Sequence, residues 1–214
     1  MNFVSKKPGA IRWVVKLGGS LAESEVLSRW LDALAETTVV IVPGGGVFAD
    51  GVRAAQARFG FDDRTAHAMA ILAMRQYALM MAGFCPHLTL AADLGRLSAA
   101  ARKAERAVLW LPDPKAVDER EVPASWEVTS DSIAAWLARR LRAERLLLVK
   151  AAPIAFRGAE FERLGSAGTV DAAFAAFAAK ARFETWLCRR EDYNRLDRGL
   201  ENPDAAFTRV IAGA

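Results

Sequence analysis

Two glycine clusters each follow a β-branched run and precede a helical pattern. Gly18 and Gly19 follow the run 11–17, and Gly44-Gly45-Gly46 follows the run 38–42. Glycine lets backbone N–H groups approach a ligand closely, and the helix start behind it adds a partial positive charge. Two such turns are expected side by side at the carboxyl edge of a parallel sheet, where ligands bind. The pair predicts a phosphate site; a geometric need for glycine in tight turns is the alternative.

Lysines accompany these turns. Lys16 lies two residues before Gly18, and Lys150 follows the run 146–149 as a second candidate cation near the same edge. An ammonium group near the end of a parallel strand is costly to bury without an anion, so we infer a phosphate partner for Lys16. Snorkelling of this lysine to the rim is the alternative. Neither glycine cluster has the spacing of a Walker A loop or of a GxGxxG dinucleotide site.

A polar cluster, Thr129-Ser130-Asp131-Ser132, precedes another helical pattern. All four residues are favourable near a helix start, so an ordinary N-cap is one interpretation. The N-cap explains one of these residues but does not require four polar ones. A carboxylate at this position would hold nearby lysines, or a metal, in place for phosphoryl transfer. Asp131 is therefore a candidate catalytic residue.

Three basic side chains follow the second glycine cluster. Arg53 and Arg64 are candidates to bind an anionic group of a second substrate, and a solvated role fits either equally well. His67 lies near the start of a long apolar pattern, where a lone histidine is more often a core or interface residue than a catalyst. Cys85 and Cys188 lie far apart and form no metal-binding spacing, so no metal site is predicted.

The composition favours one globular domain over residues 1–214. Hydrophobic residues make up 53% of the 214 residues and charged residues 25%, which is enough apolar material for a sizeable core. The net charge of +4 and the pI of about 9.3 favour phosphate-bearing ligands but are too weak to indicate nucleic acid binding. Two cysteines indicate no disulfide framework, and a cytoplasmic location is the simpler interpretation. The most apolar stretch, 66–84, carries Arg75 and Gln76 and predicts a buried helix rather than a membrane span.

Short β-branched runs alternate with helical patterns, which predicts an α/β fold with a mainly parallel sheet covered on both faces. Strands are expected at 11–17, 38–42, 87–91, 107–111, 145–149, 185–188 and 207–211, and helices at 22–36, 47–58, 62–81, 131–141 and 170–181. The helix 62–81 is apolar nearly all round, so it is expected either to be covered by the sheet and a second copy of the chain or to be wholly internal. The proline-rich segment 112–125 is expected to be a surface excursion bordering a site.

Three of these motifs together resemble the signatures of the amino acid kinase superfamily, which includes uridylate, acetylglutamate, aspartate and isopentenyl phosphate kinases. The motifs are Lys16-Leu17-Gly18-Gly19-Ser20, Pro43-Gly44-Gly45-Gly46 and Thr129-Ser130-Asp131-Ser132. The resemblance covers the N-terminal two-thirds of the chain. It implies a three-layer αβα sandwich in which residues 1–125 bind the acceptor and residues 126–214 bind ATP.

Within the superfamily, the segments 66–77 and 126–134 resemble the short kinases of methanofuran-type cofactor biosynthesis. This resemblance implies ATP-dependent phosphorylation of aminomethylfuranmethyl phosphate to its diphosphate in methanofuran or methylofuran biosynthesis. A uridylate-type nucleoside monophosphate kinase and a non-catalytic nucleotide- or oxyanion-binding protein are the alternatives. The expected partners are ATP and a small phosphorylated substrate, without nucleic acid or membrane, in a homodimer or larger homo-oligomer.

The resemblance also implies roles for the motif residues. Lys16 would contact the transferring phosphoryl group, and Asp131 would hold the catalytic lysine. The remaining phosphate- and ATP-binding candidates are Gly18, Gly19, Ser20, Thr129 and Ser130, and the substrate-binding candidates are Gly44, Gly45, Gly46, Arg53, Arg64 and His67. Mg²⁺ would bridge the β- and γ-phosphates of ATP. Because a phosphate acceptor is already ionised near neutral pH, catalysis would consist mainly of alignment and charge neutralisation.

The chain departs from the family pattern in its nucleotide half. Many relatives have an Asp-Gly turn after the strand that ends here at Val149, where this chain has Lys150-Ala151-Ala152-Pro153-Ile154. A later glycine-rich segment ending in lysine is also missing. Lys150 or Lys180 is a candidate to replace that second catalytic cation.

Overall fold

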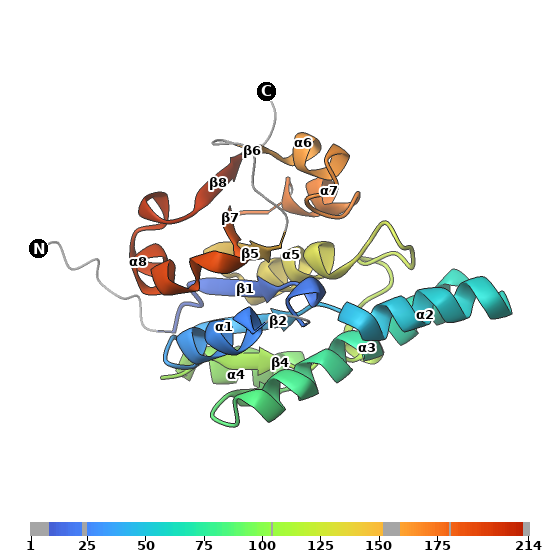
Figure 1. Ribbon diagram of the computed structural model, residues 1–214, viewed down its shortest axis with the longest axis horizontal. Helices are drawn as coiled ribbons and strands as arrows, with labels where there is room; N and C mark the ends of the chain where they lie inside the picture. Colours follow the sequence, from blue (N-terminus) through green and yellow to red (C-terminus); the bar gives the residue numbers. More distant parts are fainter. Residues whose placement is uncertain (1–8, 23–24, 104, 152–158, 180, 212–214) are drawn as a thin grey trace, which may run out of the picture.

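The computed structural model describes residues 9–22, 25–103, 105–151, 159–179 and 181–211, arranged around an eight-stranded sheet (Figure 1). The strand order is β3-β4-β2-β1-β5-β7-β8-β6, and every neighbouring pair is parallel except β7 and β8. The strands are β1 Trp13–Leu17, β2 Val39–Pro43, β3 Thr89–Ala91, β4 Val108–Trp110, β5 Arg145–Lys150, β6 Ala159–Glu160, β7 Glu184–Arg189 and β8 Thr208–Ile211.

Eight α-helices are described: α1 Val26–Ala35, α2 Gly46–Phe59, α3 Asp63–Phe84, α4 Leu94–Lys103, α5 Ser130–Leu141, α6 Phe161–Ser166, α7 Phe174–Ala178 and α8 Leu196–Glu201. Four short 3-10 helices are η1 Gly19–Leu21, η2 Pro114–Ala116, η3 Arg190–Arg195 and η4 Pro203–Ala205. Helices α2 and α3 pack against each other as a pair that projects beyond the sheet (Figure 1). Gly60, with φ of +71°, ends α2, and Asp62 then caps α3 by accepting a 2.7 Å hydrogen bond from the Thr65 N–H.

The central strands are buried on both faces, which explains their continuous apolar sequence. Alternate residues of β1 belong to two different clusters because successive side chains point to opposite sides of a strand. Val14 packs in one cluster with Trp136 of α5, and Val15 packs in the other with Trp30 of α1. Helices therefore cover both faces of the sheet, and the predicted layered α/β architecture is confirmed.

The structure differs from the predicted elements in several places, and the sequence patterns did not predict β6, α6 or α8. The helix expected at 170–181 is reduced to Phe174–Ala178, because residue 171 is engaged at the start of α5, while Lys180 lies outside the described residues. The sequence patterns did not predict α4, whose only buried residue is Leu97. The prediction of a wholly internal long helix is wrong, because α3 exposes Leu72, Leu79 and Phe84. Its coverage by a second copy stays a prediction. None of the described helices is both long and apolar enough to cross a membrane.

Candidate active site

The carboxyl ends of three adjacent strands place the predicted motifs at one edge of the sheet. Leu17 of β1 is in register with Pro43 of β2 on one side and with Val149 of β5 on the other. The three strands therefore end at the same level. The first glycine cluster, the second glycine cluster and Lys150 all follow this edge, as the parallel arrangement predicts.

The two glycine clusters touch through their backbones. The Gly44 N–H donates a 2.8 Å hydrogen bond to the carbonyl of Leu17. A Cβ atom on Gly19 would lie 2.1 Å from the nitrogen of Gly46, and one on Gly44 would lie 2.3 Å from the nitrogen of Gly19. Gly46 also has a φ of +53°, in the left-handed region. Glycine is therefore required for this close approach, and the peptide groups of Gly19, Gly45 and Gly46 border a cavity directly.

Lys16, Asp131 and the partly buried Lys150 form an ion-paired cluster at the same edge. One oxygen of the Asp131 carboxylate pairs with Nζ of Lys16, and the other accepts a hydrogen bond from Nζ of Lys150, each at 2.8 Å. Lys16 and Asp131 are both 4% exposed, so the snorkelling interpretation of Lys16 is wrong. Two ammonium groups and one carboxylate leave a formal charge of +1 in a poorly hydrated place. Such a cluster attracts an anion.

Burial and charge oppose each other at these groups. Burial by itself would raise the pKa of Asp131, but the ion pairs with Lys16 and Lys150 outweigh it and hold this pKa well below its ordinary value. Burial and the repulsion from Lys16 lower the pKa of Lys150, while the attraction of Asp131 opposes them. Asp131 is therefore ionised at neutral pH and keeps both lysines in fixed positions.

A residue that the sequence motifs did not reveal, Asp171, fixes the start of α5. Its carboxylate accepts hydrogen bonds from the Thr129 N–H at 3.0 Å, the Thr129 hydroxyl at 2.9 Å and the Ser132 N–H at 2.9 Å, and also from the Ser132 hydroxyl. The Thr129 side chain makes no cap of its own, so a local N-cap is the wrong explanation for this residue. The cap comes instead from a carboxylate about forty residues away, which orients the turn that carries Asp131.

Replacing Asp171 with alanine is expected to destabilise the fold by about 1–3 kcal/mol, because two backbone N–H groups and two hydroxyls lose a charged acceptor. We also expect kcat to fall, since Asp131 sits in the same turn. Urea denaturation and steady-state kinetics check both effects. Asp197→Ala, an exposed aspartate in the first turn of α8, serves as the control. Equal stability of the two variants would contradict this role of Asp171.

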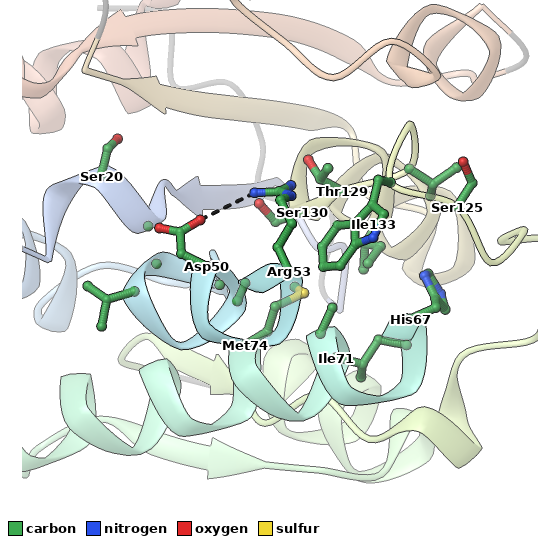
Figure 2. Close-up of a pocket in the computed structure, with 18 of the residues that line it drawn as sticks. Ser20, Asp50, Arg53, His67, Ile71, Met74, Ser125, Thr129, Ser130 and Ile133 are labelled. Carbon is green, nitrogen blue, oxygen red and sulfur yellow. Dashed lines mark hydrogen bonds and ion pairs between the residues drawn. The ribbon is translucent and has the colours of Figure 1, made fainter. Parts of the chain in front are cut away.

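A cavity of about 450 Å³ lies between α2, α3 and the start of α5, and we call it the first cavity. Figure 2 shows Ser20 at one end and His67 at the opposite end, with Arg53 between them and paired with Asp50 at 3.3 Å. Nineteen residues line it: Gly19, Ser20, Gly45, Gly46, Val47, Ala49, Asp50, Arg53, Asp63, His67, Ala70, Ile71, Met74, Ser125, Trp126, Val128, Thr129, Ser130 and Ile133.

A second cavity, of about 670 Å³, adjoins the first. It is lined by Asp131, Lys150 and the segment 168–172, and it shares Asp63, Ser125, Trp126 and Thr129 with the first cavity. The carboxylate that holds both lysines therefore borders one cavity, and the glycine turns border the other. Two adjoining cavities with a cationic cluster at their edge suit a reaction between two anionic substrates.

Most of the predicted site residues come together here. Lys16, Gly18 and Gly44 line neither cavity, but Lys16 pairs with Asp131, which lines the second. Tyr77 donates a 3.3 Å hydrogen bond to the Gly18 carbonyl. Arg64 is the exception: its side chain is exposed and its Nε pairs with Glu119 at 2.9 Å, and it does not line the first cavity. Its neighbour Asp63 faces the cavity instead, because adjacent residues on a helix point in different directions.

Trp126, the first residue of the segment 126–134, lines both cavities, and Gln56, which lines neither, holds it in place. The Trp126 Nε1–H donates a 2.6 Å hydrogen bond to Oε1 of Gln56, and the Arg53 guanidinium lies 4.3 Å from the Trp126 ring centroid. Nε2 of Gln56 in turn donates to Asp63 at 2.8 Å. Gln56 therefore ties the tryptophan to the beginning of α3. Ser125, at the end of the segment expected to border a site, lines both cavities.

Comparisons with known proteins agree with this geometry. The profile of the amino acid kinase family matches residues 12–153, more than half of the chain. The [5-(aminomethyl)furan-3-yl]methyl phosphate kinase of Methanocaldococcus jannaschii is 27% identical over 141 residues, which cover 63% of this chain and 63% of that protein. The match thus spans less than two-thirds of the relative's length.

Two solved structures are similar in fold. The uridylate kinase of Archaeoglobus fulgidus superposes with a TM-score of 0.69 at 17% identity, over 94% of this chain and 100% of that chain. The isopentenyl phosphate kinase of T. acidophilum superposes with a TM-score of 0.60 at 14% identity, over 94% and 100% of the two chains. Both confirm the fold.

Proposed function

Because the chain belongs to the amino acid kinase family, whose members include ATP-dependent kinases, we propose that it transfers the γ-phosphoryl group of ATP to a small acceptor that already carries a phosphate. The observation that carries this proposal is the buried Lys16–Asp131–Lys150 cluster beside two adjoining cavities. In this proposal the acceptor occupies the first cavity, and ATP occupies the second.

The chemistry needs little beyond alignment. An ionised oxygen of the acceptor phosphate attacks the γ-phosphorus, the bond from that phosphorus to the β–γ bridging oxygen breaks, and ADP leaves. The ammonium groups of Lys16 and Lys150 offset the negative charge that the two substrates bring together. Asp131 holds both ammonium groups and takes no proton, because its pKa is held low. No general base is required, since the attacking oxygen is already ionised.

Magnesium fits this site as a companion of ATP rather than as an ion held by the protein alone. Among the described residues, no group of three His, Cys, Asp or Glu side chains is placed to hold a metal. Both oxygens of Asp131 are engaged by lysines. Mg²⁺ would therefore be coordinated by the ATP phosphates and by water, and would supply further charge neutralisation there.

For the acceptor we propose aminomethylfuranmethyl phosphate, which would be converted to its diphosphate in methanofuran- or methylofuran-type cofactor biosynthesis. The support is the name of the Methanocaldococcus relative together with the size of the first cavity. In this arrangement the acceptor phosphate lies against Gly45, Gly46 and Arg53. Its ring extends from there along α3.

An ADP-release assay with Mg²⁺ and ATP tests this proposal. The acceptors are aminomethylfuranmethyl phosphate, UMP, isopentenyl phosphate and none, and ³¹P NMR identifies the product. We expect turnover with the furan and a diphosphate signal. Faster turnover with UMP would overturn the proposed acceptor but would still support phosphoryl transfer from ATP to a phosphorylated acceptor. ATP binding without turnover of any acceptor would overturn the kinase proposal in favour of a binding protein.

A further inference from the structure

The charges that line the first cavity are unusual for a site that takes only an anion. Two carboxylates, Asp50 and Asp63, line it together with one cation, Arg53. Arg53 already pairs with Asp50 at 3.3 Å. Within the described regions of the chain no lysine or arginine pairs with Asp63, which receives only the neutral Gln56 amide at 2.8 Å. A negative charge without a matching cation of the protein therefore lies at the exposed rim that the first cavity shares with the second.

Helix α3 runs along the first cavity, and its residues line the cavity from one end to the other. Asp63, His67, Ile71 and Met74 line it at helical spacing and so form one stripe of the helix. Tyr77 continues the stripe and reaches the carbonyl of Gly18, so this end of the stripe is the glycine end. The seven residue steps from Met74 back to His67 cover about 10 Å along the helix axis. His67 therefore lies at the end of the first cavity remote from the glycines (Figure 2). Asp63, one turn earlier on the same stripe of α3, lies on the same side.

His67 has an unused hydrogen-bonding atom at this remote end. It is 8% exposed, and its Nε2 is shielded from solvent and has no hydrogen-bond partner among the described residues. Burial lowers the pKa of His67, while the charge of Glu119 opposes this effect. The imidazole is therefore neutral at neutral pH and carries one nitrogen lone pair. A buried polar atom without a partner is costly unless a ligand satisfies it.

We propose that Asp63 and His67 bind a protonated primary amine on the acceptor, at the end of the molecule opposite its phosphate. Ile71 and Met74, with the ring of Trp126, would enclose a small flat ring between the two charged ends. Gln56 holds Asp63 and Trp126 in place through its 2.8 Å and 2.6 Å hydrogen bonds. The inference rests on the proposed function and adds to it: the first cavity selects a zwitterion.

The same residues disfavour other phosphorylated acceptors. The carbonyl oxygens of a uracil ring would face the negative charge of Asp63, which repels them. An apolar hydrocarbon tail would bury Asp63 and the unpaired nitrogen of His67 without compensation. Asp63 and His67 are therefore specificity-determining residues.

The experiment compares two ligands by isothermal titration calorimetry without ATP: aminomethylfuranmethyl phosphate and its analogue with a methyl group in place of the aminomethyl group. We expect the wild type to bind the amine about 10- to 100-fold more tightly, as for hydrogen bonds to a charged group. In Asp63→Asn this preference should fall about tenfold. In His67→Leu, which removes the unpaired nitrogen, it should fall by a smaller factor. Thermal melts of each variant verify folding.

Asp50→Asn is the matched control, because Asp50 lines the same cavity but already pairs with Arg53. It should change the preference less than Asp63→Asn does. Equal affinity of the wild type for the two ligands, with turnover of both, would overturn the amine site and leave the kinase proposal intact. A preference that survives in Asp63→Asn and His67→Leu would overturn the assignment of these residues. Binding of neither ligand, with turnover of no phosphorylated acceptor, would overturn both proposals.

Discussion

Lys16→Met is expected to lower kcat by about 100- to 1,000-fold, the loss typical of removing one preorganised charge from a transition state. Methionine keeps most of the apolar stem of lysine and removes only the ammonium group. That group is buried and lies 2.8 Å from Asp131, so no solvent cation takes its place readily. The KM of the acceptor should change much less, because the charge matters most during transfer. Steady-state kinetics with ADP detection measure both constants.

The fold should survive this substitution. Without Lys16, Asp131 still pairs with Lys150 at 2.8 Å, and the buried cluster becomes neutral. Lys103→Met, at the exposed end of α4, is the matched control and should keep wild-type kinetics. Unchanged kcat in a folded Lys16→Met protein would contradict the catalytic role of Lys16.

The sheet and the location of the cluster could be predicted because they depend on regular patterns. Buried parallel strands have continuous β-branched runs in their sequence, and their carboxyl ends must meet at one edge of the sheet. Residues at the carboxyl ends of these strands, such as Lys16 of β1 and Lys150 of β5, are therefore brought together by the topology itself. The close contact between Gly19 and Gly46 follows from the same rule.

The residues that support the cluster could not be predicted in this way. Asp171 is a single carboxylate in an alanine-rich segment, and its partners Thr129 and Ser132 lie about forty residues earlier. No periodic pattern in the sequence indicates a contact between residues so far apart along the chain. Gln56 is similar, because its hydrogen bonds to Trp126 and Asp63 depend on how α2 packs against α3. For Arg64 the structure favours the solvated alternative, because proximity in sequence to the glycine cluster does not fix which way a helical side chain points.

Asp131→Asn is expected to destabilise the fold by about 3–5 kcal/mol at neutral pH, because it removes the carboxylate shared by two ammonium groups and leaves the buried Lys16 without a counter-charge. Lys16→Met lacks this penalty, so the two variants should differ in stability although both lose activity. Asp32→Asn, an exposed aspartate of α1, is the control and should unfold like the wild type. Urea denaturation measures the free energies of unfolding.

The difference in the free energy of unfolding between the wild type and Asp131→Asn should depend on pH, and this dependence identifies its cause. In the wild type the pKa of Asp131 is held below its ordinary value of 3.8, so its ion pairs stabilise the fold above that pH. This contribution is lost as the pH falls through the pKa of the folded state, and the gap between wild type and Asp131→Asn should narrow there. In the variant, Lys150 keeps the burial that lowers its pKa but loses the opposing attraction of Asp131, so it binds a proton more weakly when folded than when unfolded. The stability of the variant should therefore rise with pH on the alkaline side, as Lys150 loses its charge. A gap that stays constant from acidic to alkaline pH would show that the loss of stability has a cause other than charge.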